Sequence, residues 1–231
     1  MIQPRITNLP TTSYQSNLIK AAIFDLDGVI VDTAHYHYLA WKQLAAGLGI
    51  DLTLDHNERL KGVSRIRSLE IILEIGNVSL TAEEKEALAD KKNGWFVELI
   101  EKMSPEEVFP GVKELIDEMR AKGLQVGLAS SSKNAPRVLE LLNIRDQFDT
   151  IVDGTMITHS KPDPEIFLLA ASRLGLDPAD CLVFEDAEAG VEAALRAGMK
   201  CVGVGDAAQL GQANIIIPRT GDFQLSDLDR L

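Results

Sequence analysis

Two aspartates stand two residues apart, directly after a short apolar run near the start of the chain. Residues 21–24 have the character of a buried strand, and Asp25 and Asp27 follow them where Gly28 permits a sharp turn. The strand period of two points both carboxylates to the same side. Two such groups repel each other unless a cation or a shared proton lies between them. The pair suits Mg²⁺ with acid–base or nucleophilic chemistry, although a polar strand end with an Asp-rich turn has the same pattern.

Three further polar groups stand at the ends of predicted strands or before predicted helices. Ser130 follows an apolar run, Lys161 is held in a Lys-Pro-Asp-Pro sequence, and Glu185-Asp186 ends another apolar run. Hydroxyls before a helix suit a phosphate, a fixed ammonium suits a transferring phosphoryl group, and added carboxylates complete an oxygen-rich Mg²⁺ site. Taken singly, they also fit a helix cap, a solvated lysine and acids placed near a helix dipole. Together with the aspartate pair, they favour one phosphoryl-transfer site.

The elements that must position these groups alternate between strand and helix. Strands are predicted at residues 21–24, 124–129, 148–152, 181–184, 200–204 and 215–217, with helices at 112–121, 136–142, 164–174 and up to Gly198. Continuously apolar strands separated by helices indicate a parallel sheet covered on both faces. In such sheets the catalytic and ligand-binding residues lie beyond the carboxyl ends of the strands.

Residues 34–103 interrupt this alternation with helical patterns and no strand pattern. Apolar residues recur at helical spacing over 34–48, and Thr81 with Glu84 forms a capping-box start for a helix towards Leu99. We therefore expect a leader at 1–19, a core domain formed by 20–33 and 104–231, and an inserted helical domain at 34–103.

The composition narrows the possible partners. The net charge is −12, from 23 basic and 35 acidic residues, which gives no support to binding of nucleic acid or an anionic membrane. Cys181 and Cys201 are predicted to be buried free thiols in a reducing compartment. No apolar run reaches the about 18 residues of a membrane span, and residues 1–19 lack a signal-peptide pattern. We expect a cytoplasmic protein.

Four motifs, in their order along the chain, resemble those of the haloacid dehalogenase superfamily. They are Asp25-Leu26-Asp27-Gly28-Val29, Ser130 after the second strand, Lys161-Pro162 and Glu185-Asp186. The resemblance covers nearly the whole chain after the leader. It implies an α/β fold with a Rossmann-like parallel-sheet core and an inserted, all-α helical cap domain.

A narrower resemblance is to the β-phosphoglucomutase family. It is carried by Asp25 to Ile30 with Asp32-Thr33-Ala34 and His37, by Leu60-Lys61-Gly62-Val63-Ser64-Arg65 with Ser68, by Lys91-Lys92-Asn93, and by Leu128 to Asn134. Ala187 departs from the pattern, because relatives commonly have serine or threonine there. The resemblance implies Mg²⁺-dependent interconversion of β-D-glucose 1-phosphate and glucose 6-phosphate through an aspartyl-phosphate and β-glucose 1,6-bisphosphate.

The same resemblance implies a role for each motif residue. Asp25 would be the nucleophile and Asp27 the general acid–base. Mg²⁺ would bind Asp25, Asp27 through its backbone carbonyl, and Asp186, with Glu185 at the edge of the site. Ser130 and Lys161 would hold the transferring phosphoryl group. The second phosphate would be bound by Arg65, Ser132, Lys133 and Asn134. Residues placed around the substrate are His37, Trp41, Lys61, Gly62, Val63, Ser64, Ser68, Lys92 and Ser131.

A mutase of this kind must exclude water during transfer, so we expect the cap to close. Hinges are expected at Thr33 and near residues 105–110. The basic residues 61–65 also fit a plain surface loop, and His37 also fits a packed helical histidine beside Trp41.

Three other functions compete with the mutase. A sugar-phosphate phosphatase would use the same aspartates with water as the final acceptor. A non-catalytic phosphosugar-binding or regulatory protein is the weaker candidate, because every expected carboxylate is present. A dehalogenase fits poorly, since a second phosphate site would have no purpose. We expect a monomer that acts on sugar phosphates.

Overall fold

The computed structural model describes residues 19–60 and 63–231. Within them, six parallel strands form one sheet in the order β3-β2-β1-β4-β5-β6. The strands are β1 (Ala21–Phe24), β2 (Gln125–Ala129), β3 (Thr150–Val152), β4 (Cys181–Glu185), β5 (Lys200–Val204) and β6 (Ile215–Ile217). All six predicted strands are present. The third is shorter than expected because a 3₁₀ turn at Arg145–Gln147 precedes it.

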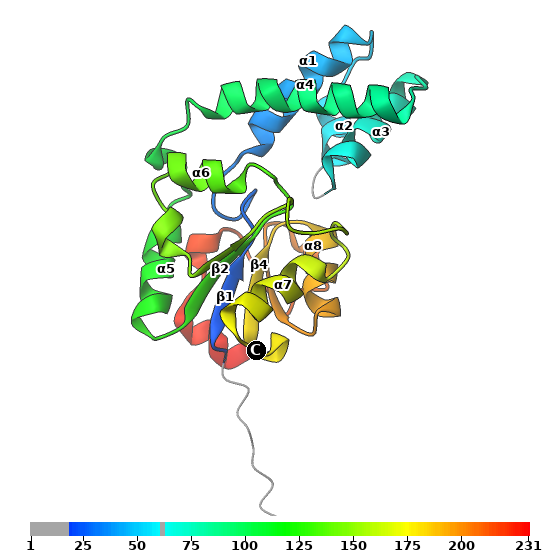
Figure 1. The fold of residues 1–231 in the computed structure, drawn as a ribbon. Helices are drawn as coiled ribbons and strands as arrows, with labels where there is room; N and C mark the ends of the chain where they lie inside the picture. Colours follow the sequence, from blue (N-terminus) through cyan, green and yellow to red (C-terminus); the bar gives the residue numbers. More distant parts are fainter. Residues whose placement is uncertain (1–18, 61–62) are drawn as a thin grey trace, which may run out of the picture.

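Helices cover both faces of this sheet (Figure 1). They are α5 (Val112–Ala121), α6 (Ala135–Leu141), α7 (Glu165–Leu174), α8 (Glu188–Arg196) and the short α9 (Ala207–Leu210). The side chains of β1 alternate between two hydrophobic clusters. Phe24 packs in the cluster that includes residues of α5 and α6, whereas Ile23 packs in the cluster formed with α7 and α8. This explains why the strands are apolar on both sides.

The described part of residues 34–103 is helical, with α1 (Ala34–Gly47), α2 (Leu54–Glu58), α3 (Arg65–Gly76) and α4 (Ala82–Ile100). These helices have a hydrophobic cluster of their own, around Trp41, Leu69 and Ile72. The predicted capping box is formed, because Thr81 and Glu84 bond each other's backbone N–H groups. The fold is therefore an α/β parallel-sheet core with an inserted helical cap, as expected.

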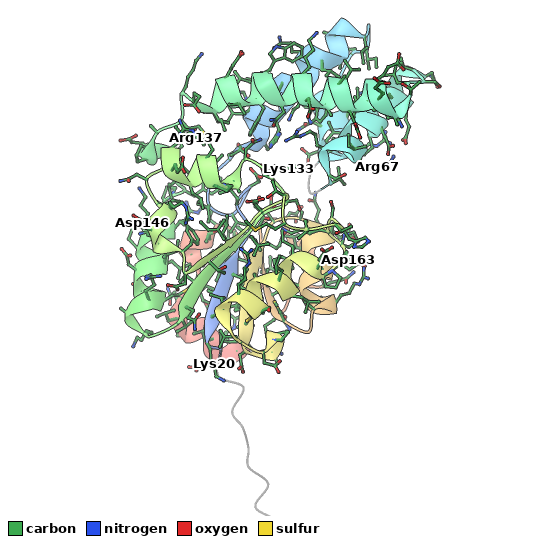
Figure 2. All side chains as sticks on the ribbon, in the orientation of Figure 1. Lys20, Arg67, Lys133, Arg137, Asp146 and Asp163 are labelled. Carbon is green, nitrogen blue, oxygen red and sulfur yellow. The ribbon has the colours of Figure 1, made fainter. Side chains whose placement is uncertain are left out.

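The cap contacts the core on one side, through α4 and α6 (Figure 1). Phe96 and Ile100 of α4 belong to the same cluster as Val138 of α6. Beside them, the guanidinium of Arg137 donates to both carboxylate oxygens of Glu101, at 2.9 and 2.7 Å. Figure 2 shows Arg137 beneath the C-terminal end of α4 and Lys133 in the space between cap and core.

Two chain segments connect the cap to the core. They are hydrogen-bonded to each other, and the first of them is also bonded to the C-terminal region. The N–H of Phe109 donates to the carbonyl of Ile30 at 2.8 Å, and the hydroxyl of Thr220 donates to the carbonyl of Val29 at 2.6 Å. The expected hinge residue Thr33 is buried immediately before α1.

Other expectations concern the chain as a whole. Cys181 and Cys201 are both buried free thiols. Of the predicted leader, Ile19 is buried against the core, and the rest lies outside the described residues. Among the helices of the described chain, none is both long and apolar enough to cross a membrane.

Candidate active site

The sheet register brings the predicted chemical groups to one edge. Phe24 is paired with Leu128 on one side and with Phe184 on the other. The residues that follow these strands therefore emerge side by side, and the N–H of Asp25 donates to the carbonyl of Phe184 at 3.0 Å. The strand order reverses between β1 and β4, which is where parallel α/β sheets bind their ligands.

Lys161 forms the centre of this site. Its Nζ donates to Asp25 Oδ1 and to Glu185 Oε1, each at 2.5 Å, and to the carbonyl of Ala129 at 3.4 Å. The side chain is buried, and burial alone would lower its pKa, but the ion pairs with Asp25 and Glu185 raise the pKa above its usual value. Lys161 is therefore a permanently charged group fixed against the proposed nucleophile.

The two aspartates of the first motif differ in their surroundings. Asp25 accepts bonds from Lys161 and, at 2.9 Å, from the N–H of Asp27. Burial raises the pKa of Asp25 to about 6, with Lys161 opposing the shift. Asp27 has no comparable cation beside it, so burial and the nearby Asp25 raise its pKa to about 8. The raised pKa favours the protonated form of Asp27, which is the form that a general acid requires.

The carboxylates fit a Mg²⁺ ion. Asp25, Asp27 and Asp186 border the same cavity, and the buried Oδ1 of Asp27 has no hydrogen-bond partner. Burial and the neighbouring Glu185 raise the pKa of Asp186 to about 8. Buried carboxylates with raised pKa values, those of Asp25 and Asp186, suit a hard cation, whereas the unpaired Oδ1 of Asp27 is left available for proton transfer. Gly28 makes room for the Asp186 carboxylate, because a Cβ at Gly28 would lie 1.9 Å from Asp186 Oδ2.

Glu185 is placed differently from the other acids. Its Oε1 accepts from Lys161 at 2.5 Å and its Oε2 accepts from the N–H of Ala187 at 2.9 Å. Both oxygens are thus engaged within the protein, so the geometry favours a role in fixing Lys161 over direct metal binding. Gly190 permits this placement, because a Cβ there would lie 1.8 Å from Glu185 Oε1.

The loop after β2 is ordered by its own hydroxyls. Ser130 Oγ accepts from the N–H of Ser132 at 3.1 Å, and Ser132 Oγ accepts from the N–H of Asn134 at 3.3 Å. Ser131 Oγ is buried without a partner, and the Lys133 side chain is exposed. All five residues from Ser130 to Asn134 line the cavity.

The cap contributes three basic side chains to the cavity, those of His37, Arg65 and Lys92. The ring of His37 stacks on Phe96 with centroids 3.9 Å apart, and its Nδ1 lies 2.6 Å from Lys92 Nζ. Lys92 is buried, with its Nζ 4.6 Å from the centre of the Trp41 ring. Burial and the nearby Arg65 lower the pKa of Lys92 to about 7.

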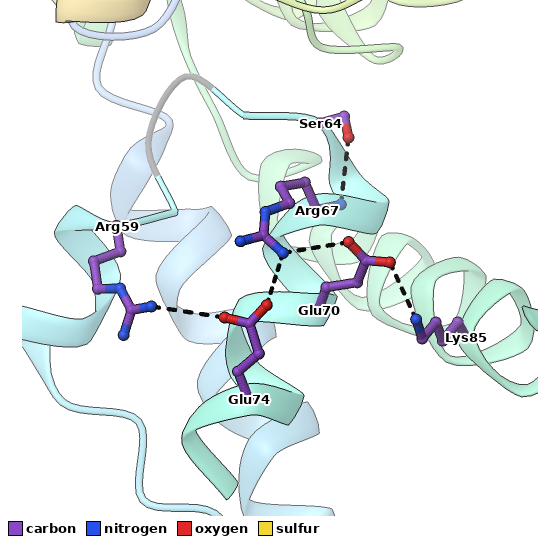
Figure 3. Close-up of polar contacts among 6 residues, drawn as sticks. All are labelled: Arg59, Ser64, Arg67, Glu70, Glu74 and Lys85. Carbon is purple, nitrogen blue, oxygen red and sulfur yellow. Dashed lines mark hydrogen bonds and ion pairs between the residues drawn. The ribbon is translucent and has the colours of Figure 1, made fainter. Parts of the chain in front are cut away.

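A charged network outside the cavity holds the cap helices together (Figure 3). Arg67 Nη1 lies 2.8 Å from Glu74 and 3.4 Å from Glu70, and Lys85 of α4 lies 3.1 Å from Glu70. At the start of α3, Ser64 Oγ accepts from the N–H of Arg67 at 3.3 Å. Ser64 therefore caps the helix that begins with Arg65.

The cavity between cap and core has a volume of about 550 Å³, which lies within the usual range of small-molecule sites. Most of the sequence-predicted residues that the structure describes line it: Asp25, Asp27, His37, Trp41, Val63, Ser64, Arg65, Ser68, Lys92, Ser130, Ser131, Ser132, Lys133, Asn134, Lys161, Glu185 and Asp186. Thr33 is not among the lining residues. Lys61 and Gly62 lie outside the described residues.

The loop after β3 was not among the predicted site residues, yet it supports the site. Asp153 Oδ1 accepts from the N–H of Thr155 at 2.7 Å and from its hydroxyl at 2.6 Å. A Cβ on Gly154 would lie 2.2 Å from the carbonyl oxygen of Ser131. This loop therefore supports the one that carries Ser131. The rule that working groups follow parallel strands would have singled out Asp153 and Gly154.

A second group with possible metal ligands lies before α7, where ligand atoms of His159, Asp163 and Glu165 come within 4.8 Å of one another. Glu165 already accepts from the N–H groups of Thr158 and His159 at 2.9 and 2.7 Å. These contacts order the helix start and explain the cluster without a metal.

Comparisons with known proteins agree with the fold and the motifs. Residues 19–198 match the model of the haloacid dehalogenase-like hydrolase family. The chain belongs to that family.

Within it, a β-phosphoglucomutase of Bacillus subtilis (strain 168) is 48% identical over 209 residues, which cover 90% of this chain and 92% of that protein. The crystal structure of a β-phosphoglucomutase from Clostridium difficile superimposes with a TM-score of 0.89 at 43% identity, covering 92% of this chain and 96% of that one. A phosphorylated carbohydrates phosphatase of Thermotoga maritima is 34% identical, covering 79% of this chain and 83% of that protein.

Proposed function

We propose that this protein is an isomerase that interconverts β-D-glucose 1-phosphate and glucose 6-phosphate through β-glucose 1,6-bisphosphate. The observation that supports the proposal is that two groups of residues predicted to bind phosphate line one cavity. Asp25, Lys161 and Ser130 stand at the sheet edge, and Arg65 of the cap faces the loop of Ser132 to Asn134. A bisphosphorylated intermediate needs both regions at once.

In the transfer step, a carboxylate oxygen of Asp25 attacks phosphorus and the bond from phosphorus to the sugar oxygen breaks. Asp27, whose pKa is raised to about 8 by burial and by Asp25, gives its proton to the departing oxygen. In the second half of the cycle Asp27 takes a proton from the attacking hydroxyl, and the phosphoryl group leaves Asp25 for the sugar. Lys161 and the hydroxyl of Ser130 hold the phosphoryl oxygens.

Mg²⁺ would be held by Asp25, Asp186 and the backbone carbonyl of Asp27, and when bound it would offset the negative charge that gathers during transfer. Glu185 completes the arrangement by holding Lys161 against Asp25. The ion pair also keeps the Asp25 carboxylate in one orientation, so that little rearrangement is needed before attack.

The phosphatase is the second candidate, and the 34% identity to a carbohydrate phosphatase favours keeping it. The two functions use the same Asp25 and differ in the final acceptor of the phosphoryl group. In a mutase, a second phosphate site would bind the other phosphate of the intermediate and favour closure of the cap. Closure keeps water from the aspartyl-phosphate. We further propose that the protein acts as a cytoplasmic monomer.

The proposal is tested by offering β-glucose 1-phosphate, Mg²⁺ and a trace of β-glucose 1,6-bisphosphate, and by following glucose 6-phosphate and free phosphate together. We expect isomerisation with little phosphate released, and none of either product from Asp25→Asn. One free phosphate for each sugar consumed would establish the phosphatase instead.

A further inference from the structure

One side-chain oxygen joins the cap to the core beside the cavity. Asn93 Oδ1 on α4 accepts a hydrogen bond from Arg65 Nη2 at 2.8 Å and another from Asn134 Nδ2, also at 2.8 Å. Arg65 begins α3 in the cap, and Asn134 immediately precedes α6 in the core. Three elements that are far apart in the sequence therefore meet at a single acceptor.

The two hydrogen-bond donors line the cavity, whereas the acceptor does not. Among the described residues that line it are Arg65 and Asn134, but not Asn93. Asn93 therefore holds both donors from outside the cavity. Arg65 has further N–H groups free to bind an anion, since a guanidinium has five donors and Asn93 accepts one.

The chemistry of an amide suits this position. A neutral carbonyl oxygen fixes the direction of the guanidinium without cancelling its charge, whereas a carboxylate would form an ion pair and compete with a phosphate. The carboxylate of Asp90 lies 3.5 Å from Arg65 Nη1 and is itself largely exposed, so this ion pair is weak. The positive charge of Arg65 is thus left available towards the cavity.

We propose that Asn93 is a positioning residue for the second phosphate. It ties Arg65 of the cap and Asn134 of the core into a single phosphate-binding site, which is complete only while the cap stands in this place over the core. The inference rests on the proposed function, because it concerns how the second phosphate of the substrate is bound. It adds a residue that makes the binding of that phosphate depend on the position of the cap.

The contact differs from an ordinary cap–core bond in one testable respect. If Asn93 only fastened α4 to α6, Asn93→Asp would serve as well as asparagine, because a carboxylate is an equally good acceptor. If it positions Arg65 while leaving the charge of Arg65 free, Asn93→Asp must weaken phosphate binding although the acceptor is kept.

The experiment compares KM for β-glucose 1,6-bisphosphate with KM for acetyl phosphate, which has a single phosphate and no use for the second site. We expect Asn93→Ala and Asn93→Asp each to raise the bisphosphate KM about five- to tenfold, the effect of losing one or two hydrogen bonds. The ratio of the two KM values should rise by the same factor. Lys102→Gln, which makes the same change of charge at an exposed position after α4, should leave the ratio as in the wild type.

A double-mutant cycle tests whether Asn93 acts through Arg65. In an Arg65→Ala background, Asn93→Ala should raise the bisphosphate KM by clearly less than it does in the wild type, because only Asn134 remains of the two groups that Asn93 positions. A full-sized effect in that background would overturn the proposal, as would a wild-type KM ratio in Asn93→Asp.

The role of Asn93 and the proposed mutase activity can be disproved independently of each other. A wild type that only hydrolyses the bisphosphate would disprove the mutase, yet its KM values would still decide the role of Asn93. If the wild type turns over neither substrate, calorimetric titration of the bisphosphate into the same variants gives the same comparison, with Kd in place of KM.

Discussion

At the scale of single residues, the site depends on groups that hold Lys161 as much as on Lys161 itself. Glu185 fixes the ammonium, and Gly190 leaves the space that Glu185 occupies. We predict that Gly190→Ala lowers kcat by about a hundredfold, because displacing Glu185 moves a charge that acts on the transferring group.

Gly94→Ala is the matched control, since a Cβ there meets nothing within 4 Å. That control should keep wild-type kcat and gain about 0.5–1 kcal/mol of stability. Equal kcat values in the two variants would contradict the account.

The pKa shifts predict a pH-dependent stability when Mg²⁺ is removed. Burial raises the pKa of Asp27 and of Asp186 from 3.8 to about 8. Between those values the folded protein binds more protons than the unfolded chain, so the free energy of unfolding falls as pH rises. With a chelator present, we expect Tm to drop by roughly 10 °C between pH 6 and pH 8, for a loss of about 2 kcal/mol from each of the two carboxyls. Mg²⁺ should restore Tm at pH 8, and Asp186→Asn should reduce the drop. A flat profile in chelator would show that these carboxyls ionise freely.

At the scale of elements, apolar periodicity predicted all six strands and the helical character of the described part of residues 34–103. It succeeded because parallel strands buried on both faces are continuously apolar, as β1 and β4 are. The contacts between elements could not be predicted in this way. Nothing in the pattern pairs Glu101 with Arg137 or brings Asn93 to Arg65, because such contacts depend on how α4 lies across α6.

The Glu101–Arg137 pair yields a prediction for the cap. Arg137→Glu places a third acid beside Glu101 and Glu140, both of which Arg137 contacts. We expect the share of turnover that ends as free phosphate to rise about two- to fivefold at low salt, because the α4–α6 contact is weakened. The double variant Arg137→Glu with Glu101→Arg should return the share towards the wild-type value. An unchanged share in the single variant would mean that this pair does not hold the cap.

At the scale of the whole molecule, four separate motifs become one site because a parallel sheet brings its strand ends to one edge. That convergence could be predicted from the order of strands and polar groups, and the cavity includes most of the expected residues that the structure describes. The different roles of the acidic residues could not be predicted from the sequence. Glu185 and Asp186 are adjacent in sequence and both border the cavity, yet both carboxylate oxygens of Glu185 are bonded within the protein, to Lys161 and to the N–H of Ala187.

The central claim is that the phosphoryl group on Asp25 passes to a sugar and is kept from water. The most direct test loads the protein with labelled phosphate from acetyl phosphate in the presence of Mg²⁺ and then adds β-glucose 1-phosphate. We predict that most of the label appears in the sugar bisphosphate, and that Asp25→Asn takes up none. Label released as free phosphate at the same rate with and without the sugar would contradict the claim and make this protein a phosphatase.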